Sequence, residues 1–120
     1  MATALLSTQP LVAASDEAKL AATCAAHDLA NWDFERETRD PADVSEAWKK
    51  QAEGYRRLAI ARGMSEAEAD RLIAASRPKL TVQIKAWLYS TDPALESAQE
   101  KLMKHCARLM KRAPEMAPYR

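Results

Sequence analysis

Residues 15–32 read SDEAKLAATCAAHDLANW, and this stretch decides the fold. Ser15 can cap a helix, and the two acidic residues after it are favourable at the positive end of the helix dipole. At about 100° per residue, two opposite stripes of this helix are compact or apolar. They carry Leu20, Cys24, His27 and Asn31 on one side and Ala18, Ala22, Ala25 and Leu29 on the other. We therefore expect neighbouring helices to approach closely from both sides as far as about Trp32, while residues 33–40 fit either helix or loop.

Two Asp-Pro pairs predict the starts of further helices. Proline at the first helical position costs no hydrogen bond, and the aspartate before it can cap the helix. Asp40-Pro41 precedes an amphipathic stretch, and Asp92-Pro93 precedes a helix that should end near Pro114. The sequence therefore predicts one helix from Pro41 and a last helix from Pro93.

A third helical segment lies between these two. Gly63 is typical of a left-handed helix stop, and Ser65 with Glu68 forms a capping box for the next helix. The apolar stripe keeps one phase from residue 66 to about 90 although Pro78 lies inside it, which predicts one helix kinked at that proline. With short connections throughout, the sequence predicts an all-α, up-down-up-down four-helix bundle.

Composition agrees with this fold class and limits the function. The 120 residues include only two glycines and one phenylalanine, so helix formers dominate. A net charge of +1 gives no overall attraction to nucleic acid or membranes. No apolar run approaches the ~20 residues of a membrane span. We expect a helical bundle domain over 15–113 and a loose C-terminal tail over 114–120.

The first fourteen residues, MATALLSTQPLVAA, contain no charge. They end in Val12-Ala13-Ala14, which has the small-residue spacing of a signal-peptidase cleavage site, with Pro10 just upstream. This pattern predicts the remnant of a secretory signal peptide, and hence a periplasmic or secreted protein. The alternative is an apolar arm on a cytoplasmic protein.

The two cysteines lie at matching depths in the first and last helices. Cys24 is about eight residues from the start of its helix, and Cys106 about seven from the end of its own, so in an antiparallel pair they reach similar heights. An even, minimal cysteine count together with the signal-like segment predicts a Cys24–Cys106 disulfide. The alternatives are two buried free thiols, or a copper or zinc site that also uses His27 and Met103.

Two groups of residues are candidates for binding a partner. Trp32 and Phe34 are large aromatics beside a charged connection, which is typical of interface anchors, although burial in the core explains Trp32 equally well. Basic residues share an arc of about 100° on the last helix: Lys101, Lys104, Arg108, Lys111 and Arg112. The simpler explanation of this arc is a solvated face that stabilises the negative end of the helix dipole. The functional explanation is a binding site for an acidic partner.

Catalytic motifs are missing from the sequence. It contains no nucleophile elbow, phosphate-binding glycine loop, HExxH or dinucleotide fingerprint. We therefore predict a protein that is not an enzyme, needs no cofactor and binds another protein, as inhibitors, immunity proteins, adaptors and chaperones do. The alternatives are a soft-metal carrier, or a cytoplasmic module whose basic face binds an acidic partner or nucleic acid. Nucleic acid is disfavoured because no aromatic residues alternate with the cations, and self-association is compatible with the sequence.

Overall fold

The computed structural model describes residues 14–120, which form an all-α helical bundle, as the sequence predicts. The elements are α2 (Asp16–Thr38), the 3₁₀ helix η1 (Pro41–Asp43), α3 (Ala47–Ala61), α4 (Glu66–Tyr89), α5 (Pro93–Arg112) and the 3₁₀ helix η2 (Pro114–Tyr119). Residues 14–120 contain no helix that is both long and apolar enough to cross a membrane. The predicted signal remnant at 1–14 lies outside the described residues except for Ala14.

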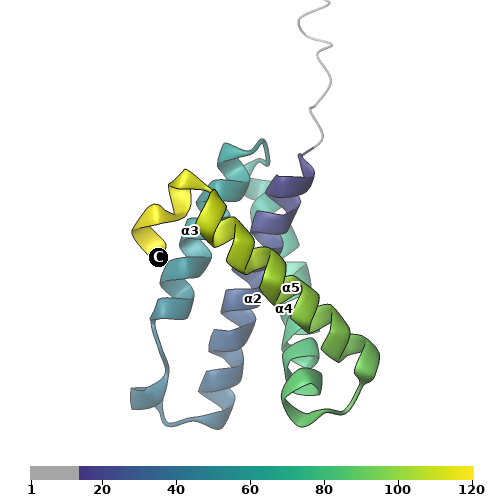
Figure 1. Cartoon of the computed structure of the whole chain (residues 1–120). Helices are drawn as coiled ribbons and strands as arrows, with labels where there is room; N and C mark the ends of the chain where they lie inside the picture. Colours follow the sequence, from purple (N-terminus) through teal and green to yellow (C-terminus); the bar gives the residue numbers. More distant parts are fainter. Residues whose placement is uncertain (1–13) are drawn as a thin grey trace, which may run out of the picture.

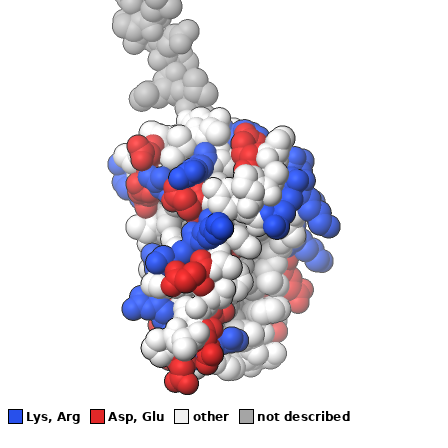
Figure 2. Space-filling model, turned by 90° about the vertical axis from the view of Figure 1, so that its left-hand side faces the viewer, with Lys and Arg blue, Asp and Glu red and all other residues white. Residues whose placement is uncertain are grey.

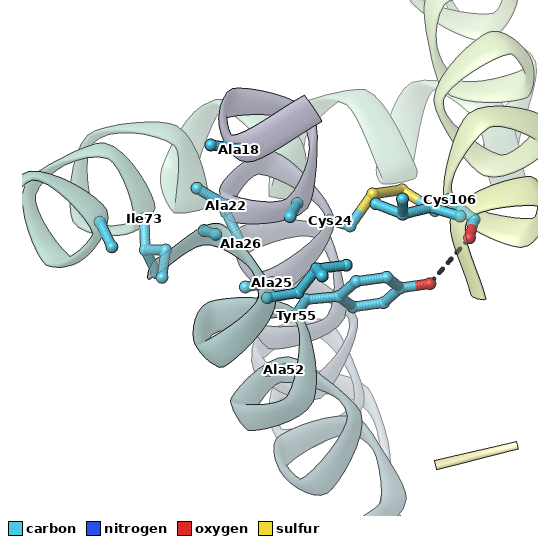
Figure 3. Close-up of a cluster of buried hydrophobic side chains, with 14 of the residues drawn as sticks. Ala18, Ala22, Cys24, Ala25, Ala26, Ala52, Tyr55, Ile73 and Cys106 are labelled. Carbon is cyan, nitrogen blue, oxygen red and sulfur yellow. Dashed lines mark hydrogen bonds between the residues drawn. A yellow bond between two sulfur atoms is a disulfide. The ribbon is translucent and has the colours of Figure 1, made fainter. Parts of the chain in front are cut away.

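Helix α2 is the centre of the bundle and contacts α3, α4 and α5 (Figure 1). Its buried face consists largely of alanines with no exposed surface: Ala18, Ala21, Ala22, Ala25, Ala26 and Ala30. Such small side chains let neighbouring helices approach closely, and Figure 3 shows side chains of α3 and α4 converging on this alanine-rich face. This confirms that α2 is packed on more than one side, as its two stripes predict.

The predicted helix ends are confirmed where side chains cap the backbone. The side chains of Ser15, Ser65 and Asp92 each accept hydrogen bonds from backbone amides in the first turn of the helix that follows. Gly63 has a φ of +109°, a backbone conformation that other residues rarely adopt, so it ends α3 as predicted. These local signals therefore set three helix starts and one stop.

The start of α3 differs from the prediction. The helix expected at Pro41 begins at Ala47 instead, because η1 and an extended segment intervene. The Glu35 carboxylate, near the end of α2, accepts hydrogen bonds from the Ser45 backbone amide at 3.0 Å and from the Trp48 indole at 2.8 Å. These two bonds hold the connection against α2. The helix continues to Thr38 and so includes most of residues 33–40, for which the sequence fits either helix or loop.

Helix α5 lies obliquely across the front of α2 in Figure 1. Three residue pairs join α2 to α5 and occur in opposite order along the two helices: Glu17–Arg112, Cys24–Cys106 and His27–Gln99. The two helices are therefore antiparallel where they meet. Helix α4 is continuous across Pro78. The kink at this proline and a regular up-down-up-down order stay predictions.

The C-terminal residues 114–120 are not loose, in contrast to the prediction. They form η2, in which Met116 is fully buried. Tyr119 packs over Gly54 of α3, and the Arg120 guanidinium donates hydrogen bonds to three backbone carbonyls at the end of α5. A run with two prolines is a poor α-helix former, but it closes the end of the bundle through these contacts.

Candidate binding surface

The predicted disulfide between Cys24 and Cys106 is present, with a Cα–Cα distance of 5.7 Å. Both cysteines are buried, and the Tyr55 hydroxyl donates a 2.8 Å hydrogen bond to the backbone carbonyl of Cys106 (Figure 3). The bond fixes the middle of α5 on α2, while Tyr55 links the same turn of α5 to α3. Three helices are thus tied together at one point.

The alternative metal site is not supported in this state. Joined cysteines have no thiolate to offer a metal, and His27 is occupied by an amide: Gln99 Nε2 lies 2.8 Å from His27 Nε2. Because an amide nitrogen can only donate, His27 Nε2 must be the acceptor. Gln99 Oε1 in turn accepts from Gln83 at 3.0 Å. Within residues 14–120, no three His, Cys, Asp or Glu side chains are grouped to hold a metal ion.

Asp28, next to His27, was not singled out from the sequence. Burial raises the pKa of the Asp28 carboxyl to about 8 and lowers the pKa of the His27 imidazole to about 4. The two side chains lie 3.9 Å apart, and Asp28 Oδ2 has no hydrogen-bond partner. With exposed fractions of 5% and 7%, Asp28 and His27 are out of reach of a substrate, so we assign them to the core. The sequence signal was a lone acid among the alanines of α2.

Trp32 and Phe34 do not form one surface. They are two residues apart on α2, so they point about 200° apart. The Trp32 ring lies beneath Arg36, at 4.4 Å from the guanidinium carbon, and Lys49, at 5.0 Å from Nζ. Phe34 instead packs beside Tyr89 of α4, with ring centroids 6.4 Å apart. Both aromatics are half-buried, and their role in binding a partner stays a prediction.

A groove of about 660 Å³ lies between α2 and α4. Its most prominent charged groups already bind each other: Arg77 donates two hydrogen bonds to the Asp33 carboxylate, at 2.6 and 2.7 Å. A second ion pair links Glu37 to Lys85 at 3.0 Å. Arg36 also lines the groove and lies over the Trp32 ring instead of an acidic partner. Because the other charges are satisfied internally, the groove offers few free polar groups that would converge on a ligand.

The basic residues of α5 behave differently from those in this groove. All are exposed, and we call them the basic face: Lys101, Lys104, Arg108, Lys111 and Arg112. Among the described residues only Arg112 has an acidic partner, Glu17 at 2.9 Å. Figure 2 shows Lys and Arg side chains gathered at the upper right edge of the molecule, on the side where α5 lies. The basic face is thus an exposed positive surface with little internal compensation.

Comparison with known proteins does not identify a function for this surface. No protein-family model, curated protein or solved structure matches the chain. The function is therefore inferred from the chemistry of the surface itself, and above all from the cations of α5.

Proposed function

We propose that this is a small exported, non-enzymatic protein that acts by binding another protein, and that the basic face of α5 binds an acidic surface of that partner. The observation that carries the proposal is the absence of ion partners for Lys101, Lys104, Arg108 and Lys111 among the described residues. Elsewhere some cations are held by acidic residues of the same chain, as Arg56 and Arg77 are. Others, such as Lys50 and Lys79, have no ion partner among the described residues either, so the grouping on one stripe of a single helix distinguishes the cations of α5.

The helix dipole accounts for only part of the basic face. Lys111 and Arg112 lie in the last turn of α5, where a cation stabilises the helix end by about 0.3–1 kcal/mol. That effect falls off within one turn, so it does not explain Lys101 and Lys104 near the middle of the helix. Exposed like charges on one stripe repel each other, and an acidic partner would remove that cost.

The disulfide supports an oxidising compartment. Disulfides form and persist in the periplasm and outside the cell, and they are rare in the reducing cytoplasm. Together with the uncharged, signal-like segment of the sequence, this favours a periplasmic or secreted location for the protein. The cytoplasmic nucleic-acid-binding alternative is weaker, because no aromatic residues of α5 alternate with its cations to stack on bases.

A comparative capture experiment tests the proposal. The natural chain, a Lys104→Glu/Lys111→Glu variant and a Lys79→Glu control would be immobilised and exposed to the envelope fraction of the source cells. Lys79 is an exposed cation on a different helix, α4, and is not one of the residues of the basic face. We expect the natural chain and the control to retain the same acidic protein, and the double variant to lose it. Equal retention by all three chains would contradict the proposal.

Nucleic acid provides the second readout. The natural chain would be passed over heparin, a polyanion, and then titrated with a labelled oligonucleotide at physiological salt. We expect weak heparin retention and no specific nucleic-acid complex. Tight oligonucleotide binding with a steep salt dependence, lost in the double variant, would replace the protein partner with a nucleic acid.

A further inference from the structure

A small groove of about 220 Å³ runs between α2 and α5 beside the disulfide. It is lined by Leu20 of α2 and by His105, Arg108 and Arg112 of α5. Leu20 is half-buried and packs on the core, whereas the three α5 side chains are exposed. The groove therefore has an apolar floor and a basic rim.

Helix geometry explains why the groove lies where it does. Glu17, Leu20 and Cys24 are spaced i, i+3 and i+7, so they share one face of α2, and that face meets α5. At one end Glu17 binds Arg112 at 2.9 Å. At the other end Cys24 is bonded to Cys106. Leu20 lies between these two ties, which are about 10 Å apart along the helix axis.

The size and chemistry of the groove limit what it can hold. Pockets for drug-sized molecules measure roughly 300–1,000 Å³, so this smaller, open groove is better matched to one side chain of a partner. Its floor favours an aliphatic side chain, and its rim favours carboxylates on both sides of that side chain. An apolar centre with a charged rim is also the usual arrangement of a protein–protein contact.

We propose that this groove recognises an acidic segment of a partner protein, in which one aliphatic side chain packs on Leu20 while flanking carboxylates pair with Arg108 and its neighbours. This rests on the proposed function, because the groove is one border of the basic face. It adds the kind of sequence that is recognised: an aliphatic residue flanked by acidic residues is bound in preference to acidic residues alone.

The disulfide prepares the groove for binding. Leu20 is one turn from Cys24, and His105 is adjacent to Cys106, so the covalent bond fixes the separation of the two walls. A site held in its binding geometry before the ligand arrives does not lose affinity to ordering. The oxidised protein consequently binds the segment more tightly than the reduced protein.

Two blocked, labelled peptides test this recognition: one with a leucine between two pairs of glutamates, and one with serine in place of that leucine. Their affinities would be measured by fluorescence anisotropy at low salt, where charge pairing is strong. We expect the natural chain to bind the leucine peptide about fivefold more tightly, since partial burial of one aliphatic side chain contributes about 1 kcal/mol. Equal affinity for the two peptides would overturn the groove proposal.

Three variants and one control separate the contributions of Leu20, the disulfide and the basic rim to peptide binding. Leu20→Ser should make the two peptides bind equally, and Cys24→Ser/Cys106→Ser should weaken the leucine peptide several-fold, with circular dichroism used to verify that both variants are folded. If Leu20→Ser fails to fold, Arg108→Gln, an exposed change, takes its place and should weaken both peptides. The control Lys79→Gln should leave both affinities unchanged.

The outcomes distinguish the two proposals. Equal binding of both peptides by the natural chain, lost in Lys104→Glu/Lys111→Glu, leaves the basic face as a binding surface and removes the groove. No binding of either peptide at any salt concentration removes both. If the Leu20→Ser variant still prefers the leucine peptide, another surface binds the apolar side chain. That result would also contradict the groove proposal.

Discussion

At the scale of single residues, Asp28 and His27 are the groups whose protonation matters most for stability. Both are buried in α2, and each is held in its neutral form by desolvation. Asp28 has a pKa of about 8 in the folded chain against an ordinary value of 3.8, so its stabilising contribution is lost as the pH rises towards 8. His27 has a pKa of about 4 against 6.5, so its contribution is lost as the pH falls from 6.5 towards 4.

Between pH 4 and 6.5 the two groups change the free energy of unfolding in opposite directions, so their effects partly cancel. Above pH 6.5 only Asp28 contributes to this pH dependence. From pH 6.5 to 8 we expect the free energy of unfolding to fall by about 2 kcal/mol, at about 1.4 kcal/mol per pH unit. Asp28→Asn cannot ionise and should remove this fall, so the variant gains stability relative to the natural chain as the pH rises. Urea unfolding at several pH values measures the effect, and parallel pH profiles for the two chains would contradict it.

The roles of the capping residues were easier to predict from the sequence than those of the buried polar residues. Ser15, Ser65 and Asp92 act within their own turn, so their roles follow from neighbouring residues alone. Asp28 and His27 depend on what packs over them from other helices. Spacing put His27 on the same stripe as Cys24, but the Gln99 amide, 72 residues away in sequence, determines its chemistry.

At the scale of elements, η2 departs most from the prediction. Its docking depends on Gly54, a glycine inside α3 that would otherwise weaken the helix by about 0.5–1 kcal/mol relative to alanine. A Cβ at this position would lie 2.7 Å from the Tyr119 ring. Glycine is thus required where the C-terminal segment crosses α3, a long-range reason that local sequence patterns do not contain.

Gly54→Ala tests this crossing. We expect a loss of about 1 kcal/mol of unfolding free energy although alanine is the better helix former, because Tyr119 must move. In a Tyr119→Ala background the clash is absent, and the same change should stabilise the protein instead. Thermal unfolding of the four chains in this double-mutant cycle gives the answer. The same sign for Gly54→Ala in both backgrounds would show that Tyr119 does not explain the glycine.

Connections between elements were harder to predict than the elements themselves. The Asp-Pro signal was correct at Asp92-Pro93 but gave only a 3₁₀ turn at Pro41. The difference lies in Glu35, whose carboxylate binds the connection and delays the start of α3 to Ala47. A capping signal therefore marks where a turn can begin, and tertiary contacts determine how many residues later the α-helix begins.

At the scale of the whole molecule, the alanine faces of α2 and the disulfide organise the bundle. The Cys24–Cys106 bond spans 82 residues, most of the described chain. In the loop-entropy model, closing a loop of that length stabilises the folded state by roughly 4–5 kcal/mol. The sequence predicted this pairing because both cysteines occupy interior positions at matching depths. The oblique crossing of α5 over α2 could not be predicted in the same way, because it depends on how all four helices pack together.

Removing the disulfide should lower stability without abolishing the fold. For Cys24→Ser/Cys106→Ser we expect the free energy of unfolding to drop by roughly 4–5 kcal/mol, mostly because the unfolded chain gains freedom. The natural chain treated with reductant should match the variant within about 1 kcal/mol, and both should keep their helical circular dichroism. An unchanged urea midpoint would mean that the bond adds nothing to the stability of the folded protein.

The central claim is that a Cys24–Cys106 bond holds α5, the helix that carries the basic face, against α2 in the natural protein. The most direct test is intact mass spectrometry of protein taken from its source, with free thiols alkylated under acid-quenched conditions before any reduction. We predict an unlabelled chain that accepts two alkyl groups only after reduction, since reduction adds two hydrogens, about 2 Da. Two alkyl groups on the chain before reduction would contradict the claim.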